Sequence, residues 1–175
     1  MCIRDRNYAK ALEKKNKAED ITRVLYPNDS TWEGKRLRVK QQYVLSSASL
    51  QDILRDYRAQ HGADYYRLPE FVAVQLNDTH PAMSIPELIR LLMAEGIDFD
   101  RAFAITRSVF SYTNHTVMGE ALERWDMDLL RSVVPEICDI LLKIEERLQQ
   151  EFPGANLHVV CDNQARMADL SVYMS

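Results

Sequence analysis

The spacing of apolar residues in the N-terminal third of the chain predicts two helices separated by a loop. Residues 8–24 are charged and favour helix, which predicts a surface helix. Residues 26–34 combine Pro, Asn, Asp, Ser and Gly, which favour turns, so we predict a loop there. Apolar residues then recur at helical spacing over about residues 37–60, which predicts a long helix that ends before Gly62.

The middle of the chain predicts two strands with a helical segment between them. The mostly apolar run 71–76 suits a strand buried on both faces, and a second strand is predicted over 109–113. Ser84, followed three residues later by Glu87, has the arrangement of a capping box, which predicts a helix start at Ser84. That helix is predicted to stop at Gly96.

Further helices are predicted after Gly96, between the two strands and along the remainder of the chain. Asp98 or Asp100 is the predicted cap of the next helix. Pro135 is the predicted start of a last long helix. Its apolar stripe consists of Ile137, Ile140, Leu141, Ile144 and Leu148. Strand, helices and strand form a βαβ rhythm, so we expect a helix-rich α/β fold with parallel strands.

Composition excludes several classes of protein. Apolar residues make up 46% of the 175 residues, enough for a folded core. The net charge of −4 gives no electrostatic reason to expect a nucleic-acid partner, and no apolar run is long enough to cross a membrane. Cys2, Cys138 and Cys161 are unevenly spaced. Reduced thiols and a cytoplasmic location are therefore expected.

Two polar segments, Asn77–Pro81 and Tyr112–Thr116, follow the two predicted strands. Because ligands bind beyond the carboxyl ends of parallel strands, we expect both segments in one crevice. Asp78, His80 and His115 could ligate a metal, although Asp-x-His is a weak pattern without further ligands. A hydrolase is also open, but the chain has no Gly-x-Ser-x-Gly turn. Polar recognition of a sugar is the third possibility, and simple turn capping is the fourth. Two such segments in one crevice favour binding.

A phosphate-binding glycine loop is not evident in the sequence. The five glycines are isolated, so neither a Gly-x-Gly-x-x-Gly motif nor a P-loop is present. Arg36, Arg38 and Lys40 form a basic cluster. A cluster of this kind is more typical of the solvated start of a helix than of an anion site.

Several blocks of the sequence resemble the glycogen, starch and maltodextrin phosphorylases, in the order of that family. They are Ile21–Asp29, Glu33–Lys35, Val74–Pro81, Ile85–Leu88, Tyr112–Thr116 and Glu120–Trp125. The resemblance extends from about Asn7 to Ser175, and the short segment between Gln60 and Phe71 favours a bacterial type. It implies part of a Rossmann-like parallel-sheet domain, the N-terminal half of a two-domain glycosyltransferase-B type fold.

The resemblance implies a glycosyltransferase that moves the terminal glucosyl unit of an α-1,4-glucan to inorganic phosphate, giving α-D-glucose 1-phosphate. By resemblance, His115 is the catalytic-site residue that holds the transferred glucose at its 6-hydroxyl. Asp78, His80, Asn114 and Thr116 then line the substrate site.

The resemblance also implies a mobile gate loop. Its residues are Asn28, Asp29, Ser30 and Gly34, with Arg38 beside them. Closure of such a loop excludes water, so that phosphate captures the glucosyl group. Ser30 stands where animal enzymes have Asn, so gate regulation of the animal type is not expected. Gly119 stands where the family usually has Pro.

The family uses pyridoxal phosphate and is usually a homodimer. Its cofactor lysine and phosphate-binding segments belong to a C-terminal domain, so we expect them outside this chain and expect the chain alone to be inactive. Residues 1–6 resemble the translation of a sequencing adapter. We therefore expect residues 7–175 to be a partial N-terminal catalytic domain, truncated at both ends. The alternative is a non-catalytic α/β carbohydrate-binding module.

Overall fold

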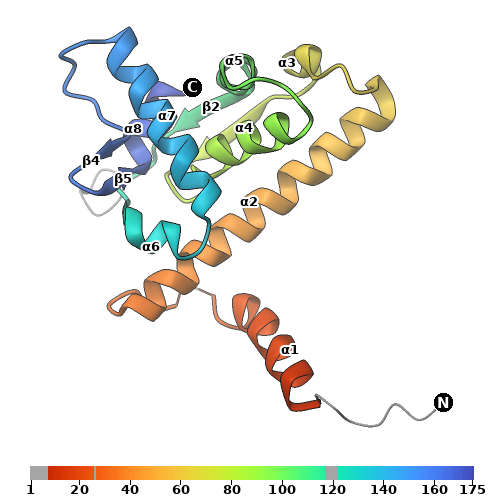
Figure 1. Cartoon of the computed structure of the whole chain (residues 1–175), viewed down its shortest axis with the longest axis vertical. Helices are drawn as coiled ribbons and strands as arrows, with labels where there is room; N and C mark the ends of the chain where they lie inside the picture. The colour runs from red at the N-terminus through yellow and green to blue at the C-terminus, as the bar shows by residue number, and fades with distance from the viewer. Residues whose placement is uncertain (1–7, 26, 117–121) are drawn as a thin grey trace.

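The computed structural model describes residues 8–25, 27–116 and 122–175 (Figure 1). In chain order, the elements are α1 (Tyr8–Arg23), α2 (Trp32–His61), the 3-10 helix η1 (Tyr65–Arg67), α3 (Leu68–Phe71), β1 (Val74–Asn77), α4 (Ser84–Ala94), α5 (Phe99–Val109), β2 (Phe110–Thr113), β3 (Arg124–Asp126), α6 (Met127–Arg131), α7 (Pro135–Glu151), β4 (Val160–Cys161), β5 (Gln164–Arg166) and α8 (Met167–Tyr173). The predicted helix-rich α/β architecture is confirmed.

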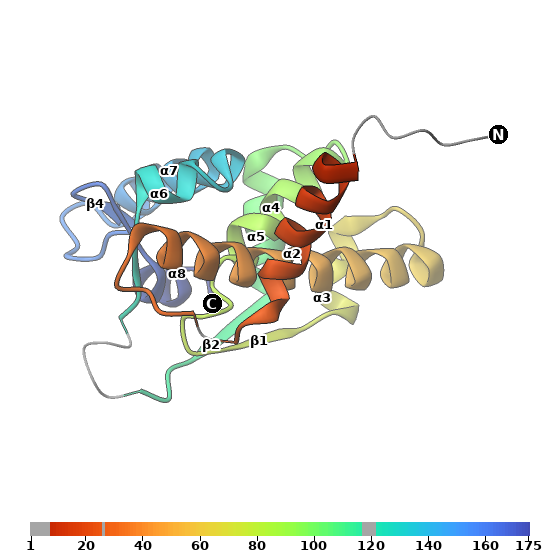
Figure 2. The ribbon, with the colours of Figure 1, turned by 90° about the horizontal axis from the view of Figure 1, so that it is seen from below.

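Strands β1 and β2 pair in parallel. Val74 lies opposite Phe110, and Asn77 lies opposite Thr113. The connection between the strands carries α4 and α5, which pack against each other and lie on one side of the strand pair in Figure 2. The predicted βαβ unit is confirmed, with both predicted helices in the crossover.

The first strand differs from its prediction in length and burial. The prediction placed it over 71–76, but Phe71 ends α3 and the strand is Val74–Asn77. Leu76 is buried, whereas Gln75 and Asn77 are exposed, so the predicted burial on both faces is wrong. Side chains alternate across a strand, and the described helices cover only the face that carries Leu76.

Helix α2 begins earlier than predicted and ends where predicted. Thr31 caps its N-terminus, because its Oγ1 accepts a hydrogen bond from the Gly34 N–H at 3.1 Å. The helix therefore starts at Trp32, inside the segment predicted as loop. Gly62 follows its end with a φ of +78°, a conformation that glycine adopts without strain.

The predicted capping box at the start of α4 is wrong. Met83 occupies the N-cap position without a side-chain hydrogen bond, and Ser84 is the first helical residue. The Glu87 carboxylate is fully buried and turns away from the helix end. It accepts hydrogen bonds from Ser47 Oγ at 2.7 Å and Tyr43 Oη at 3.1 Å, both on α2. Partners forty positions away therefore outcompete the local cap.

Other predicted helix signals hold. Asp98, not Asp100, caps α5 by accepting a hydrogen bond from the Arg101 N–H at 3.0 Å. Gly96 follows α4 with a φ of +91°. Pro135 is the first residue of α7.

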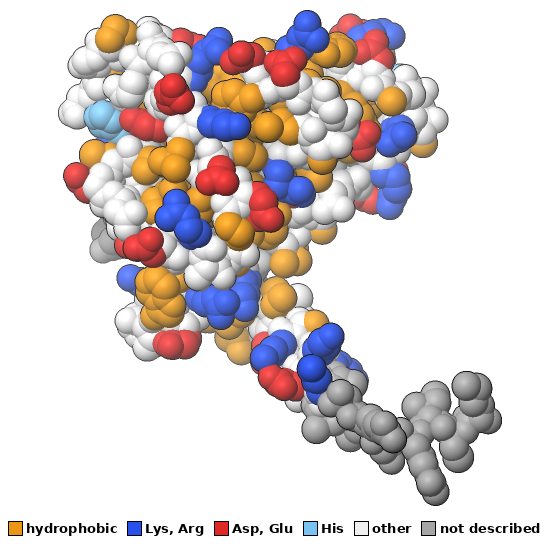
Figure 3. Space-filling model, in the orientation of Figure 1, with side chains coloured by type: hydrophobic (Ala, Val, Ile, Leu, Met, Phe, Trp, Pro, Cys, Tyr) orange, Lys and Arg blue, Asp and Glu red, His pale blue; other side chains and the backbone are white. Residues whose placement is uncertain are grey.

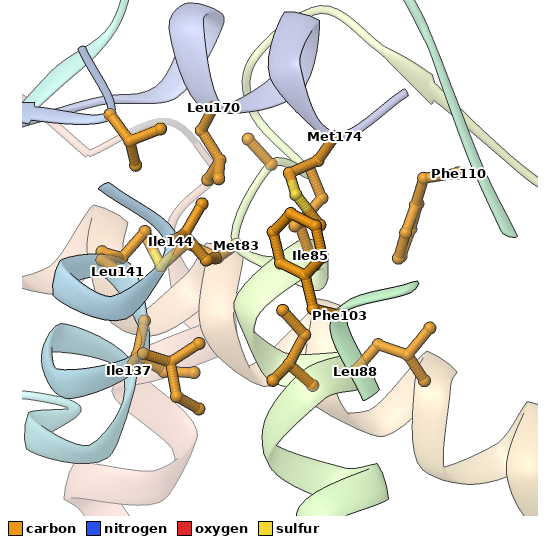
Figure 4. Packing of buried hydrophobic residues seen from close by; sticks show 14 of the residues in the cluster. Met83, Ile85, Leu88, Phe103, Phe110, Ile137, Leu141, Ile144, Leu170 and Met174 are labelled. Atoms are coloured by element: carbon orange, nitrogen blue, oxygen red, sulfur yellow. The ribbon is translucent and has the colours of Figure 1, made fainter. Parts of the chain in front are cut away.

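The core lies where α4, α5, α7 and α8 meet. The apolar stripe predicted for α7 is buried, with each of its five residues at most 5% exposed. Figure 4 shows Ile144 of α7 and Met174, just after α8, turned toward Met83 and Ile85 at the start of α4. The helical spacing of apolar residues therefore identified the helix face that packs.

The C-terminal third had been predicted to be all helical, and this prediction is wrong. β3 and β4 pair with the central strand β5 in an antiparallel sheet, in which Trp125 lies opposite Ala165. Asp162 and Asn163 connect β4 to β5 with φ values of +51° and +58°, the conformation of a tight hairpin turn. Strands of two or three residues are too short to produce a readable alternation, which explains why the sequence did not reveal them.

Helix α1 projects from the rest of the chain (Figures 1 and 2). It is a surface helix, as predicted, and its end is joined to α2 by Gln41, whose Nε2 donates to the carbonyls of Ile21 and Val24. Figure 3 shows acidic and basic side chains interspersed over one face of the molecule. Among the described residues, no helix is long and apolar enough to cross a membrane. Cys138 and Cys161 are unpaired, and Cys2 lies outside the described residues.

Candidate functional site

The parallel pairing of β1 and β2 brings the two polar segments together. Both strands end at the same edge of the sheet, at Asn77 and Thr113. The contact continues beyond the last strand residues, because the Asp78 N–H donates to the Thr113 carbonyl at 2.8 Å. On the open face of the sheet, Gln75 Nε2 donates to Thr113 Oγ1 at 2.7 Å. The expectation that both segments lie at one edge of the sheet is met.

Asp78 is the residue that joins the two segments. Its Oδ1 accepts hydrogen bonds from the His115 backbone N–H at 2.7 Å and from Thr116 Oγ1 at 3.4 Å. Its φ of +59° lies in the left-handed region, which aspartate tolerates better than most residues. This backbone turn directs the carboxylate across the strand end toward the second segment.

The second segment is further shaped by its own side chains. The ring of His115 is exposed, and its Nε2 lies 3.3 Å from Asn77 Oδ1. Asn114 Oδ1 accepts a hydrogen bond from the Thr116 N–H at 3.0 Å, which closes a local turn. The side chains of Asn114 and His115 are both exposed at this edge. Neutral donors and acceptors of this kind suit hydroxyl groups.

Tyr112 lies beneath this edge. Its hydroxyl is buried without a hydrogen-bond partner among the described residues. Burial raises the pKa of the Tyr112 hydroxyl, and the negative charge of Asp78 raises it further. The Tyr112 hydroxyl therefore stays neutral.

His80 is placed apart from the other predicted sugar-site residues. It lines a pocket of about 400 Å³ between α2 and β1, together with Arg38, Leu45 and Leu76. No hydrogen bond between described residues joins His80 to Asp78 or His115. The structure therefore brings together Asp78, Asn114, His115 and Thr116, and places His80 on the side of the predicted gate.

The predicted gate residues do form one unit. Asn28 Oδ1 accepts a hydrogen bond from the Ser30 N–H at 2.9 Å, which forms a turn. Asp29 Oδ2 lies 2.6 Å from Arg38 Nη1. Gly34 lies directly under this loop: a Cβ atom at Gly34 would come within 1.7 Å of the Asn28 carbonyl oxygen. The loop therefore folds back over the first turn of α2 at a position where no side chain fits.

The interpretation of Arg36, Arg38 and Lys40 as a solvated helix start is wrong for Arg38. Only 21% of its side chain is exposed, and it pairs with Glu123 as well as with Asp29. Arg36 also has a distant partner, the Ser132 carbonyl at 3.4 Å.

A metal site gains no support from the geometry. Among the described residues, no group of three or more His, Cys, Asp or Glu side chains could hold a metal ion. The polar segments are instead bonded to each other and to backbone groups.

Comparison with known proteins decides the family. The carbohydrate phosphorylase family matches residues 2–175. The chain belongs to the carbohydrate phosphorylase family. It is 50% identical over 155 residues to the glycogen phosphorylase of Chlamydia trachomatis, which covers 86% of this chain and 19% of that protein.

Two other phosphorylases are similar to nearly the same degree. The chain is 49% identical over 172 residues to the alpha-1,4 glucan phosphorylase L-2 isozyme, chloroplastic/amyloplastic, of Solanum tuberosum, covering 93% of this chain and 18% of that protein. It is 45% identical over 159 residues to the brain form of glycogen phosphorylase of Bos taurus, covering 84% of this chain and 19% of that protein. The chain thus spans about a fifth of the length of these curated relatives.

Neither Lys40 nor Lys143 fits the pyridoxal phosphate that phosphorylases use. Lys143 lies over the Phe99 ring in a shallow surface pocket that also holds Asp100, whose charge opposes a phosphate. Lys40 has a pKa lowered by burial and by Arg36, but the loop next to it offers no glycine-rich phosphate cradle. The predicted position of the cofactor lysine outside this chain stays a prediction.

Glu123 is the residue that sequence reasoning passed over. It lies within the block Glu120–Trp125, which resembles the phosphorylases, but the sequence indicated no binding partner for its carboxylate. In the structure its Oε1 accepts hydrogen bonds from Gln42 Nε2 at 3.0 Å and Arg38 Nη2 at 3.4 Å. A largely buried carboxylate beside an arginine of α2 has no local sequence signal, because its partners lie more than eighty positions away. Gly119 and Glu120 lie outside the described residues.

Proposed function

We propose that this chain is part of an α-1,4-glucan phosphorylase and supplies the sugar-site walls and the gate loop. Family membership over residues 2–175 supports the class. The observation that carries the site is the hydrogen bond from the His115 N–H to Asp78, because it unites the two polar segments at one strand edge. The full-length enzyme would transfer the terminal glucosyl unit of an α-1,4-glucan to phosphate, giving α-D-glucose 1-phosphate.

His115 would hold the transferred glucose at its 6-hydroxyl. Asp78 fixes the backbone of His115, and Asn77 orients its ring, so the histidine is presented with little freedom. Such preorganisation lowers the entropy lost when the sugar binds. Asn114 and Thr116 would offer their remaining polar groups to neighbouring hydroxyls, and His80 would line the adjoining wall.

The gate loop would close the site against water. Asn28, Asp29 and Ser30 form a compact turn that Arg38 holds to α2. A closed loop would let phosphate, rather than water, capture the glucosyl group. The pyridoxal phosphate of the full-length enzyme would supply its phosphate group to this chemistry from segments outside this chain.

The wider assignments are also part of this proposal. The chain would belong to the N-terminal half of a glycosyltransferase-B type enzyme of bacterial type, which is a homodimer at full length.

Replacing His115 by alanine tests the sugar site in the full-length phosphorylase that carries this segment. We expect kcat/KM for phosphorolysis to fall about tenfold, because a hydrogen bond to the reacting sugar is removed. Thermal unfolding is expected to be unchanged, since the His115 side chain is exposed. His61→Ala, at the exposed end of α2, is the matched control and is expected to leave kcat/KM unaltered. Loss of folding in the His115 variant, or full activity, would contradict the assignment.

The 175-residue chain alone is expected to release no glucose 1-phosphate from glycogen and phosphate. The reason is that neither Lys40 nor Lys143 fits the cofactor that the reaction needs, and the cofactor lysine is expected outside this chain. A coupled assay for glucose 1-phosphate, with the full-length enzyme as positive control, measures this directly. Turnover by the chain alone would overturn the proposal, and glucan binding without turnover by any full-length form would support the carbohydrate-binding alternative.

A further inference from the structure

Arg38 lies between two carboxylates that belong to different parts of the chain. Its Nη1 is 2.6 Å from Asp29 Oδ2, and its Nη2 is 3.4 Å from Glu123 Oε1. Asp29 is in the gate loop (residues 28–34), whereas Glu123 comes directly before β3. The Asp29 side chain is 49% exposed and the Glu123 side chain only 12%. One largely buried guanidinium therefore serves an acid of the gate loop and an acid of the protein body.

Glu123 is incompletely paired in this arrangement. Its Oε1 accepts from both Gln42 and Arg38, but its Oε2 is buried with no hydrogen-bond partner among the described residues. A buried carboxylate oxygen without a donor is unfavourable. Arg38 is the one cation that an ion pair joins to Glu123 in the described part of the chain.

We infer that Arg38 is a two-position latch for the gate loop. With the loop in place, its short contact is to Asp29 and its long contact is to Glu123. When Asp29 leaves, the guanidinium is free to turn both of its terminal nitrogens to Glu123 and to satisfy Oε2. Two parallel bonds between arginine and a carboxylate form a strong pair. The ion pair broken at the loop is thus replaced by a stronger one in the body, which makes opening easier.

The latch and a fixed brace predict opposite effects of neutralising Glu123 on the mobility of the gate loop. In a fixed brace, Glu123 holds Arg38 in place for Asp29, so neutralising Glu123 loosens the loop. In the latch, Glu123 competes with Asp29 for Arg38, so neutralising Glu123 leaves Arg38 with Asp29 and tightens the loop. The sign of the change at residues 27–34 therefore separates the two.

Hydrogen exchange of the peptide 27–34 in the 175-residue chain measures this sign. Glu123→Gln is expected to slow its exchange roughly two- to fivefold, the range of a partly exposed ion pair. Glu123→Asp keeps the charge but draws the carboxylate back by one methylene, so it is expected to slow exchange less than Glu123→Gln does. Faster or unchanged exchange in Glu123→Gln would overturn the latch.

Three further variants guard against an indirect effect. Gln42→Leu removes the other donor to Glu123, so Arg38 is drawn from Asp29 and exchange is expected to quicken roughly two- to fivefold. Asp29→Asn is expected to quicken it as well. Asp100→Asn breaks the ion pair to Arg147, which has the same 2.6 Å contact on another face, and is expected to change nothing at 27–34. Peptides from α4 and α7 report folding in every variant, and unchanged exchange at 27–34 in Gln42→Leu would contradict the latch.

Only the naming of residues 28–34 as a gate rests on the proposed function. In the full-length phosphorylase, Glu123→Gln is expected to lower kcat roughly two- to fivefold at unchanged KM for glucan, because opening slows while the sugar contacts stay. A full-length protein without any phosphorolysis would defeat the proposed function, and the exchange result would still decide the latch. A tightened loop with unchanged kcat would refute its role in turnover.

Discussion

Replacing Glu87 by alanine is expected to lower the free energy of unfolding of the chain by about 3 kcal/mol. Glu87 is fully buried, and its two oxygens accept hydrogen bonds from Ser47, Tyr43 and Arg90. Removing the carboxylate leaves Ser47 and Tyr43 without an acceptor and Arg90 without its counter-charge. The 31% exposure of the Arg90 side chain lets it reach water, which keeps the loss at the lower end for a broken buried pair. Denaturation followed by circular dichroism measures the change.

Glu70 offers a matched control for this variant. It pairs with Arg67, also three residues apart, and the Arg67 Nη2 to Glu70 Oε2 distance is 2.7 Å, equal to the closest Glu87–Arg90 contact. Both side chains of this pair are more than half exposed, so Glu70→Ala is expected to produce no measurable change. Equal losses in the two variants would show that burial of Glu87 and its contacts to α2 do not matter.

Replacing Gly34 by alanine is expected to lower kcat/KM of the full-length phosphorylase about a hundredfold, the cost of misplacing reacting groups by about 1 Å. The new Cβ would lie 1.7 Å from the Asn28 carbonyl oxygen, so the backbone of the gate loop has to move. The displaced loop would carry Asp29 away from Arg38. Alanine favours helix more than glycine does, so α2 itself is not expected to lose stability. Steady-state kinetics and a thermal melt of the same protein measure both effects.

Gly96→Ala separates crowding at the gate from general strain. Gly96 has a φ of +91°, but no heavy atom beyond its own residue and its two chain neighbours lies within 4 Å of the position its Cβ would occupy. Its replacement is expected to destabilise the protein by about 1 kcal/mol through backbone strain, with kcat/KM unchanged. Undiminished activity in Gly34→Ala would mean that the loop gives way without consequence, and would remove it from the proposed mechanism.

Helix ends could be predicted from the sequence because their signals are local. Asp98 bonds an N–H three residues away, and Gly62 and Gly96 adopt positive φ within two residues of their helix ends. Thr31 shows the same kind of signal, but turn-favouring neighbours masked it, so α2 starts earlier than predicted. The capping box failed for the opposite reason: Ser47 and Tyr43 reach Glu87 from another helix.

The candidate site was predictable in part. The βαβ rhythm placed both polar segments at one edge, and the pairing of Asn77 with Thr113 puts them there. The rhythm could not show that Asp78 would bind the backbone of His115. Nor could it show that His80 would face a different pocket. His80 comes two residues after Asp78 in a turn, and the turn gives its side chain another direction.

The sequence by itself determined where most of the helices and the first two strands lie, and the blocks that mark a phosphorylase, because these depend on residues close together in the chain. Only the tertiary structure decided which acids are buried and what they bind. Glu87, Glu123 and Asp78 each take partners from distant segments, at separations of about forty to eighty-five residues. A carboxylate removed from water takes whichever donors the packing brings near, and no local pattern specifies those donors.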